Sequence, residues 1–137
     1  MAVSTGKVLG GALLGGVVAG VINLLLAVGA SAAGAPLIGS VNGPGTEAVA
    51  IPILMPFLSS VLPAFGAWVV WALLNKLTKA PESIFVGVAV VFGLLSMAGP
   101  AMLENASGGT KGILSLMHVV AGLGISAGLL RAARGGS

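Results

Sequence analysis

The sequence predicts an all-α integral membrane protein, a single four-span transmembrane bundle that includes residues 1–137. Composition and charge placement predict this class. Hydrophobic residues make up 57% of the chain and charged residues only 7%, whereas about 25% of an ordinary soluble domain is charged. Every charged residue lies at or outside the boundary of a long apolar run. Unsatisfied backbone groups are costly in lipid, so apolar runs of about 20 residues are expected to cross the bilayer as helices.

The four predicted spans are separated by short polar connections. They run from about Val8 to Ala33, Ala48 to Leu74, Ser83 to Leu103 and Gly112 to Leu130. The connections are a Gly/Pro/Ser/Asn-rich segment (34–46), a basic turn (75–82) and a polar turn (104–111). The first run is longer than the 7–15 apolar residues of a secretory signal, so we interpret it as a span and not as a cleaved leader.

The distribution of Lys and Arg predicts the orientation in the membrane. If the four spans alternate, one side receives most of the cations and the other receives only Lys111, beside Glu47 and Glu104. The cations of the first side are Lys7, Lys76, Lys79, Arg131 and Arg134. The positive-inside rule therefore predicts that both termini are cytoplasmic. Trp68 and Trp71 lie late in the second span, where we expect an aromatic belt at the cytoplasmic interface.

The net charge of +3 does not indicate a nucleic-acid partner. Binding to phosphates needs clustered cations, usually with stacking aromatic rings. Here the six cations are scattered, aromatic residues are 4% of the chain and Tyr is absent. The partners expected from composition are instead the lipid bilayer and other membrane-embedded chains.

Glycines recur at four-residue spacing in the first and fourth spans. Gly at positions i and i+4 clears one helix face, and close backbone approach is what drives helix association in lipid. The residues assigned to helix packing are Gly11, Gly15, Gly16, Gly20, Gly124 and Gly128, with Gly6 and Gly10 extending the row. Two interpretations stay open: packing of the first span on the fourth, or an oligomer interface.

Three prolines mark the second predicted span. Pro52, Pro56 and Pro63 are spaced four and seven residues apart, which would place them on one helical face. Each removes a backbone donor, so we expect a kinked helix in which Ser59 or Ser60 satisfies freed backbone groups. A kinked wall can open a cavity, although membrane helices also tolerate proline without such a role.

Few polar side chains lie within the spans. Counting about 1.5 Å per residue from the span ends places Asn23, Ser96 and His118 at a common depth, with Ser115 one turn from His118. We expect these four residues to form a ligand-binding polar layer in which Asn23 pairs with His118. For His118 three interpretations stay open: a structural histidine, a proton or ligand site, or an axial ligand to haem or a chlorophyll-type pigment. The sequence itself requires no cofactor.

Catalytic and metal-binding constellations cannot be assembled from one chain. The sequence has one His, no Asp and no Cys, and its three Glu lie at the membrane edges. A Ser–His–Asp triad, a carboxylate pair and a metal cluster are therefore excluded. We expect a non-enzymatic accessory subunit or binding module in a homo-oligomer or larger membrane complex. The alternative is a lipophilic-ligand or pigment site at His118, or a channel or transporter for small solutes.

Three motifs also carry a resemblance to a family. The four-span layout has Val21-Ile22-Asn23-Leu24 in the first span, Gly99-Pro100 late in the third and Met117-His118-Val119-Val120-Ala121-Gly122 in the fourth. This layout resembles an uncharacterised family of small bacterial four-helix membrane proteins, a domain of unknown function. The resemblance implies a location in the bacterial inner membrane and supplies no known activity.

Overall fold

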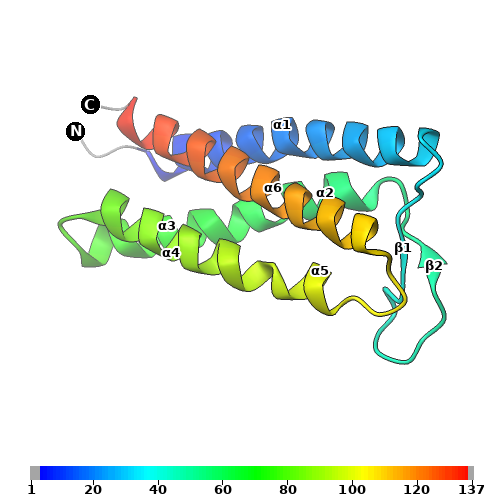
Figure 1. Ribbon diagram of the computed structural model, residues 1–137. Coiled ribbons are helices and arrows are strands. Elements are labelled where there is room, and N and C mark those ends of the chain that lie inside the picture. The colour runs from blue at the N-terminus through cyan, green and yellow to red at the C-terminus, as the bar shows by residue number, and fades with distance from the viewer. Residues whose placement is uncertain (1–3, 136–137) are drawn as a thin grey trace.

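Helix α1 (Thr5–Ala32) is the longest element of the computed structural model, which describes residues 4–135. It carries no charged side chain after Lys7. Helix α6 (Gly108–Arg134) runs antiparallel beside it, and these two helices make the most extensive contact in the bundle (Figure 1). Ser107 caps the start of α6, because its Oγ accepts a hydrogen bond from the Thr110 amide at 3.0 Å.

Each of the two middle crossings is made of two helices that meet at a break. The second crossing is α2 (Met55–Val61) followed by α3 (Pro63–Leu77), and the third is α4 (Pro81–Ser96) followed by α5 (Ala98–Met102). Pro63 starts α3, while Pro100 lacks the N–H that would bond the Ser96 carbonyl, so neither crossing continues as one uninterrupted α-helix.

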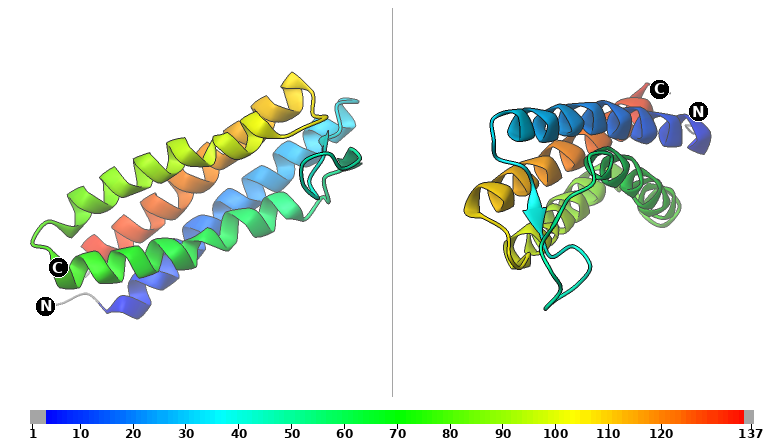
Figure 2. Two further views of the ribbon diagram at one scale, coloured as in Figure 1. Left: turned by 90° about the horizontal axis from the view of Figure 1, so that it is seen from below. Right: turned by 90° about the vertical axis from the view of Figure 1, so that its right-hand side faces the viewer.

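Four segments of the structure are long and apolar enough to cross a membrane: Thr5–Ala32, Met55–Leu77, Pro81–Met102 and Gly108–Arg134. The predicted all-α architecture with four such helices is therefore confirmed. Figure 2 shows that the second and third crossings meet at one end of the bundle and diverge toward the other.

A small hairpin replaces the beginning of the predicted second span. Strands β1 (Ile38–Gly39) and β2 (Val49–Ala50) pair antiparallel, and the Ile51 amide extends the pairing to the Leu37 carbonyl at 2.9 Å. The expectation of a helix from Ala48 was wrong, because the helix begins only at Met55. Pro52 disfavours helical geometry at the residue before it, which leaves Ile51 extended beside β1.

The bundle has two chemically different ends. The start of α1, the end of α6 and the α3–α4 turn lie together, at what we call the basic end (Figure 1). The β1–β2 hairpin and the α5–α6 connection lie at the opposite end, which we call the hairpin end.

Most of the apolar core lies toward the basic end. One cluster of buried side chains joins Val8, Ala12, Ala64, Trp71, Phe85, Ile125, Leu129 and Ala133, and a smaller one joins Ala27, Leu37 and Met117. Trp71 is 5% exposed and packs edge-on against Phe85, with ring centroids 5.8 Å apart. Trp71 therefore packs inside the bundle against α4, and its position at a membrane interface stays a prediction. The Trp68 Nε1 donates to the Thr5 carbonyl at 2.9 Å, tying α3 to the start of α1.

Candidate functional site

Glycines of α1 and α6 face each other at backbone contact. A Cβ atom placed on Gly124 would lie 2.7 Å from the carbonyl oxygen of Gly15, closer than real Cβ contacts. A Cβ on Gly11 would meet the Gly128 carbonyl, and one on Gly128 would meet the Gly11 carbonyl. Only glycine permits this approach, so α1 and α6 pack within one chain along this row.

The neighbouring glycine row of α1 packs against α2. A Cβ on Gly16 would lie 2.9 Å from the Ser60 carbonyl oxygen, and a Cβ on Gly20 would lie 2.8 Å from the Phe57 ring. A Cβ on Gly10 would meet nothing within 4 Å, and one on Gly6 would meet only the Ser4 hydroxyl at 3.6 Å. The intrachain interface therefore uses the rows from Gly11 onward and leaves Gly10 open.

The three prolines do not share one helical face. Pro52 precedes the helix, Pro56 lies in the first turn of α2, and Pro63 begins α3. Proline in a first turn removes no helical hydrogen bond, so the only break that proline introduces into the second crossing is at Pro63. The Pro56 carbonyl accepts hydrogen bonds from the hydroxyls of Ser60 at 2.6 Å and Ser59 at 3.3 Å.

Asn23 is the centre of a buried polar cluster that joins three helices. Its side chain is 1% exposed, and its Nδ2 donates to Ser60 Oγ at 2.8 Å and to the Met117 carbonyl at 2.9 Å. The Asn23 Oδ1 is buried without a hydrogen-bond partner. Ser60, which the sequence indicated only as a partner for prolines, is thus the second member of this cluster.

His118 is not part of the cluster. The side chain is exposed, and its Nδ1 lies 2.8 Å from the Leu114 carbonyl of its own helix. The predicted pairing of Asn23 with His118 was wrong. Residue counting gave the correct depth, since Asn23 bonds the residue before His118, but successive residues differ by about 100° around a helix. Met117 faces inward at 4% exposure, so His118 faces outward.

The two serines of the predicted polar layer also lie apart from Asn23. Ser96 is half-buried and donates to the Gly93 carbonyl of its own helix at 2.7 Å. Ser115 is half-buried on α6. Within residues 4–135, no hydrogen bond joins either serine to Asn23. The polar layer is therefore reduced to Asn23, Ser60 and a backbone carbonyl.

A comparison against protein families identifies the family of this chain. The model of DUF6069, a family of unknown function, matches residues 3–135. The chain belongs to DUF6069. The expected resemblance to a family of unknown function is thereby confirmed. Comparison with curated proteins and with solved structures gave no match.

Charge is distributed unequally over this DUF6069 protein. Among residues 4–135, the basic end carries five exposed cations, Lys7, Lys76, Lys79, Arg131 and Arg134, against a single carboxylate side chain, Glu82. The Arg134 Nε donates to Glu82 Oε2 at 2.9 Å. At the hairpin end the Glu104 carboxylate accepts from the Gly45 amide at 2.8 Å, and Lys111 Nζ donates to the Ala101 carbonyl at 3.1 Å. Among residues 4–135, no group of three His, Asp or Glu side chains could hold a metal ion.

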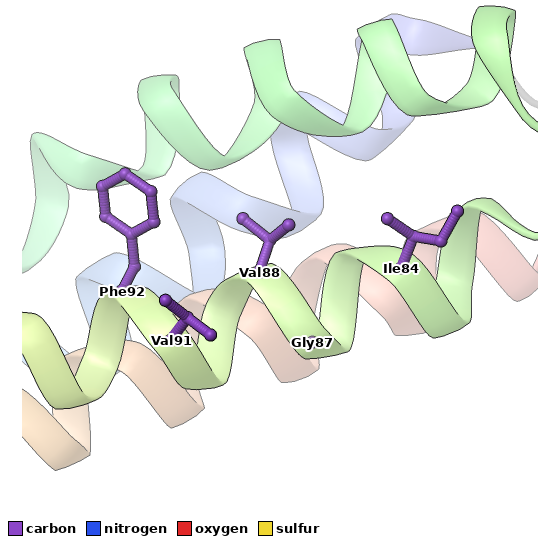
Figure 3. Close-up of a pocket in the computed structure, with 5 residues that line it drawn as sticks. All are labelled: Ile84, Gly87, Val88, Val91 and Phe92. Carbon is purple, nitrogen blue, oxygen red and sulfur yellow. The ribbon is translucent and has the colours of Figure 1, made fainter.

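The surface of the DUF6069 bundle includes an apolar groove and a smaller hollow. The larger, about 440 Å³, is an open apolar groove lined by Ile84, Gly87, Val88, Val91 and Phe92 of α4 (Figure 3). The smaller, about 180 Å³, lies under the hairpin, between Ala27 and Ser31 of α1 and the segment from Leu37 to Pro56. Sequence reasoning missed the groove; its signal is Gly87 among large apolar residues at helical spacing.

Proposed function

We propose that this protein is a non-enzymatic accessory subunit that binds another membrane-embedded chain, in an oligomer or a larger complex, through the outer face of α6. The observation that carries the proposal is the exposed imidazole of His118, which lies in a helix long and apolar enough to cross a membrane. His118 lies ten residues after the start of α6 at Gly108, which is about 15 Å along the helix. Its surroundings on the surface are apolar: Leu116, Val119 and Leu123 are all exposed.

The hydrogen bond to Leu114 determines what the imidazole offers a partner. A carbonyl oxygen only accepts, so in the neutral ring Nδ1 carries the proton and Nε2 has a free lone pair. Within the described residues, Nε2 has no hydrogen-bond partner. An unpaired polar group in an apolar medium costs about 1–3 kcal/mol in protein mutational data. A neighbouring helix that presents a donor to Nε2 removes this cost, and the open space at Gly122 leaves room for its approach.

The same geometry favours a second candidate, a lipophilic pigment or haem bound axially by Nε2. Metal-ligating histidines commonly donate their other ring N–H to a backbone carbonyl, which orients the ring. The contact of His118 Nδ1 with Leu114 has this arrangement.

One set of measurements separates these candidates. The protein is extracted in mild detergent as wild type, His118→Leu and His118→Gln, with the exposed Phe65→Leu on α3 as the control. For each sample the absorption spectrum and the mass of the protein particle are recorded. An accessory subunit is expected to give a colourless particle heavier than one chain, lost in His118→Leu and retained in His118→Gln, whose amide can still accept. A pigment site is expected to give a visible absorption band that His118→Leu abolishes. A colourless wild-type monomer would overturn both candidates.

We propose that both termini are cytoplasmic and that the membrane is the bacterial inner membrane. The excess of Lys and Arg at the basic end supports the orientation, and the resemblance to small bacterial membrane proteins supports the location. A reporter fused after Ser137 is expected to be cytoplasmic, and one inserted at Gly43, in the hairpin, is expected on the other side. Reporters on the same side would contradict this topology.

A further inference from the structure

We infer that the apolar groove along α4 binds one acyl chain of an anionic phospholipid, whose phosphate is held at the basic end by Lys76 and Lys79. The groove is lined entirely by apolar side chains of α4. Figure 3 shows Ile84, Val88 and Phe92 projecting from α4 on the side of α3. A Cβ on Gly87 would meet nothing within 4 Å, so this glycine leaves the middle of the groove open.

The groove has the position and length that a phospholipid tail needs. It begins at Ile84, in the first turn of α4, and reaches Phe92 eight residues later, about 12 Å along the helix. One leaflet of a bilayer contributes about 15 Å of hydrocarbon, half of the core. The groove thus extends through most of one leaflet, and its mouth lies at headgroup level.

Two cations lie in the α3–α4 connection, at the end of α4 where the groove begins. Lys76 lies in the last turn of α3, and Lys79 lies in the turn that leads into α4. Both are exposed, and no carboxylate of the described residues pairs with either. Glu82 lies at the same level, but Arg134 holds its carboxylate at 2.9 Å. Basic pockets between transmembrane helices are the usual sites for anionic headgroups.

Charge also selects the lipid over a second copy of this chain. A copy that docked on this groove through its own α4, in the same orientation, would bring its Lys76 and Lys79 against those of the first chain. Like charges at close range are unfavourable, whereas a phosphate neutralises both lysines at once. The fit therefore favours a lipid that pairs an apolar tail with a negative headgroup.

The test uses the full chain in detergent with equal amounts of phosphatidylglycerol and phosphatidylcholine, and native mass spectrometry counts the bound lipids. Wild type is expected to retain one phosphatidylglycerol per chain with about tenfold preference over phosphatidylcholine, since each surface lysine attracts an anionic headgroup. The double variant Lys76→Gln/Lys79→Gln is expected to lose the preference. Gly87→Leu fills the groove and is expected to lose the bound lipid.

Two matched controls keep the outcome decisive. Lys111→Gln removes a cation at the hairpin end, and Gly93→Leu adds a side chain to α4 where a Cβ would meet nothing within 4 Å. Both are expected to bind lipid as wild type does, and thermal melting checks that every variant is folded. Equal retention of the two lipids by wild type, undiminished binding by folded Gly87→Leu, or a lipid-free dimer joined through this groove would overturn the inference.

Discussion

The α1–α6 pair and the α3–α4 pair are both antiparallel and apolar, yet they pack in opposite ways. In the first pair, glycines bring the two backbones into direct contact along Gly11, Gly15, Gly124 and Gly128. In the second pair, the only buried residue of α4 is Phe85, which meets Trp71 near the basic end. Beyond this ring contact the two helices diverge (Figure 2), and α4 carries an open apolar groove on its own surface.

The difference shows what holds helices together in a bilayer. Leucine, valine and phenylalanine side chains gain little from leaving lipid tails that are equally apolar, so abundant apolar residues on α4 do not draw it against α3. Backbone contact across glycines gains van der Waals energy that lipid cannot match. The glycine rows therefore make α1 the central packing helix of the bundle, and α4 stays peripheral.

The largest effect is expected from a bulky residue in the tight pair. Gly15→Leu would drive a side chain into the α6 backbone at Gly124, where no rotamer change relieves the clash. Overpacking lowers the free energy of unfolding by about 1–3 kcal/mol and occasionally more. Because the obstacle here is backbone, we expect a loss at the upper end of this range. Denaturant unfolding in mild detergent measures the loss. Gly66→Leu on α3, where a Cβ would meet nothing within 4 Å, is the control and should unfold as wild type does. Equal stability of the two variants would remove the distinction between the helix pairs.

A smaller effect is expected in the splayed pair. Trp71→Ala removes the ring that contacts Phe85. In soluble proteins such a change costs about 3–5 kcal/mol, but here lipid can enter the space, so we expect about 2 kcal/mol. The same unfolding assay measures it, with the exposed Phe65→Ala as control. A cost matching that of Gly15→Leu would show that aromatic contacts bind helices as firmly as glycine rows do.

The smallest effect is expected from the buried polar cluster. Asn23→Leu removes two hydrogen bonds between helices, and such bonds average about 0.6 kcal/mol each in membranes. The change also removes an unpaired buried oxygen, so the net cost should be about 1 kcal/mol or less. A double-mutant cycle with Ser60→Ala measures the coupling directly. A coupling of several kcal/mol would make polar contacts, rather than glycine packing, the main stabiliser of α1.

The sequence was sufficient to predict the four long apolar helical segments, because charge cannot be placed in lipid at low cost and the charged residues therefore mark their boundaries. It was insufficient at Ala48, because apolarity alone does not distinguish a span from an apolar hairpin. The segment before Met55 is apolar enough for lipid, yet Pro52 and the pairing of β2 with β1 keep it out of the helix. The position of Pro52 indicated that the helix begins after it.

For the polar residues, counting along a helix predicted depth but not direction. Asn23 bonds the carbonyl of Met117, one residue from the predicted partner, while the imidazole of His118 faces outward. Which face of a helix is buried depends on its neighbours. The glycine rows in the sequence could have indicated the buried face of α6. Gly124 and Gly128 define the inner face of α6, and His118 lies six residues before Gly124, well off that face.

Glu104 links two connections that are far apart in the chain. Its carboxylate accepts from the Gly45 amide at 2.8 Å, its carbonyl accepts from the Ser40 amide at 2.9 Å, and Asn105 Nδ2 donates to Ser40 Oγ at 2.8 Å. These three hydrogen bonds therefore hold the hairpin against the α5–α6 connection. Deuterium should enter the amides of Ser40 and Gly45 at one shared rate, because both are released by the same opening event. Proteases that cut exposed loops should likewise cleave the hairpin slowly.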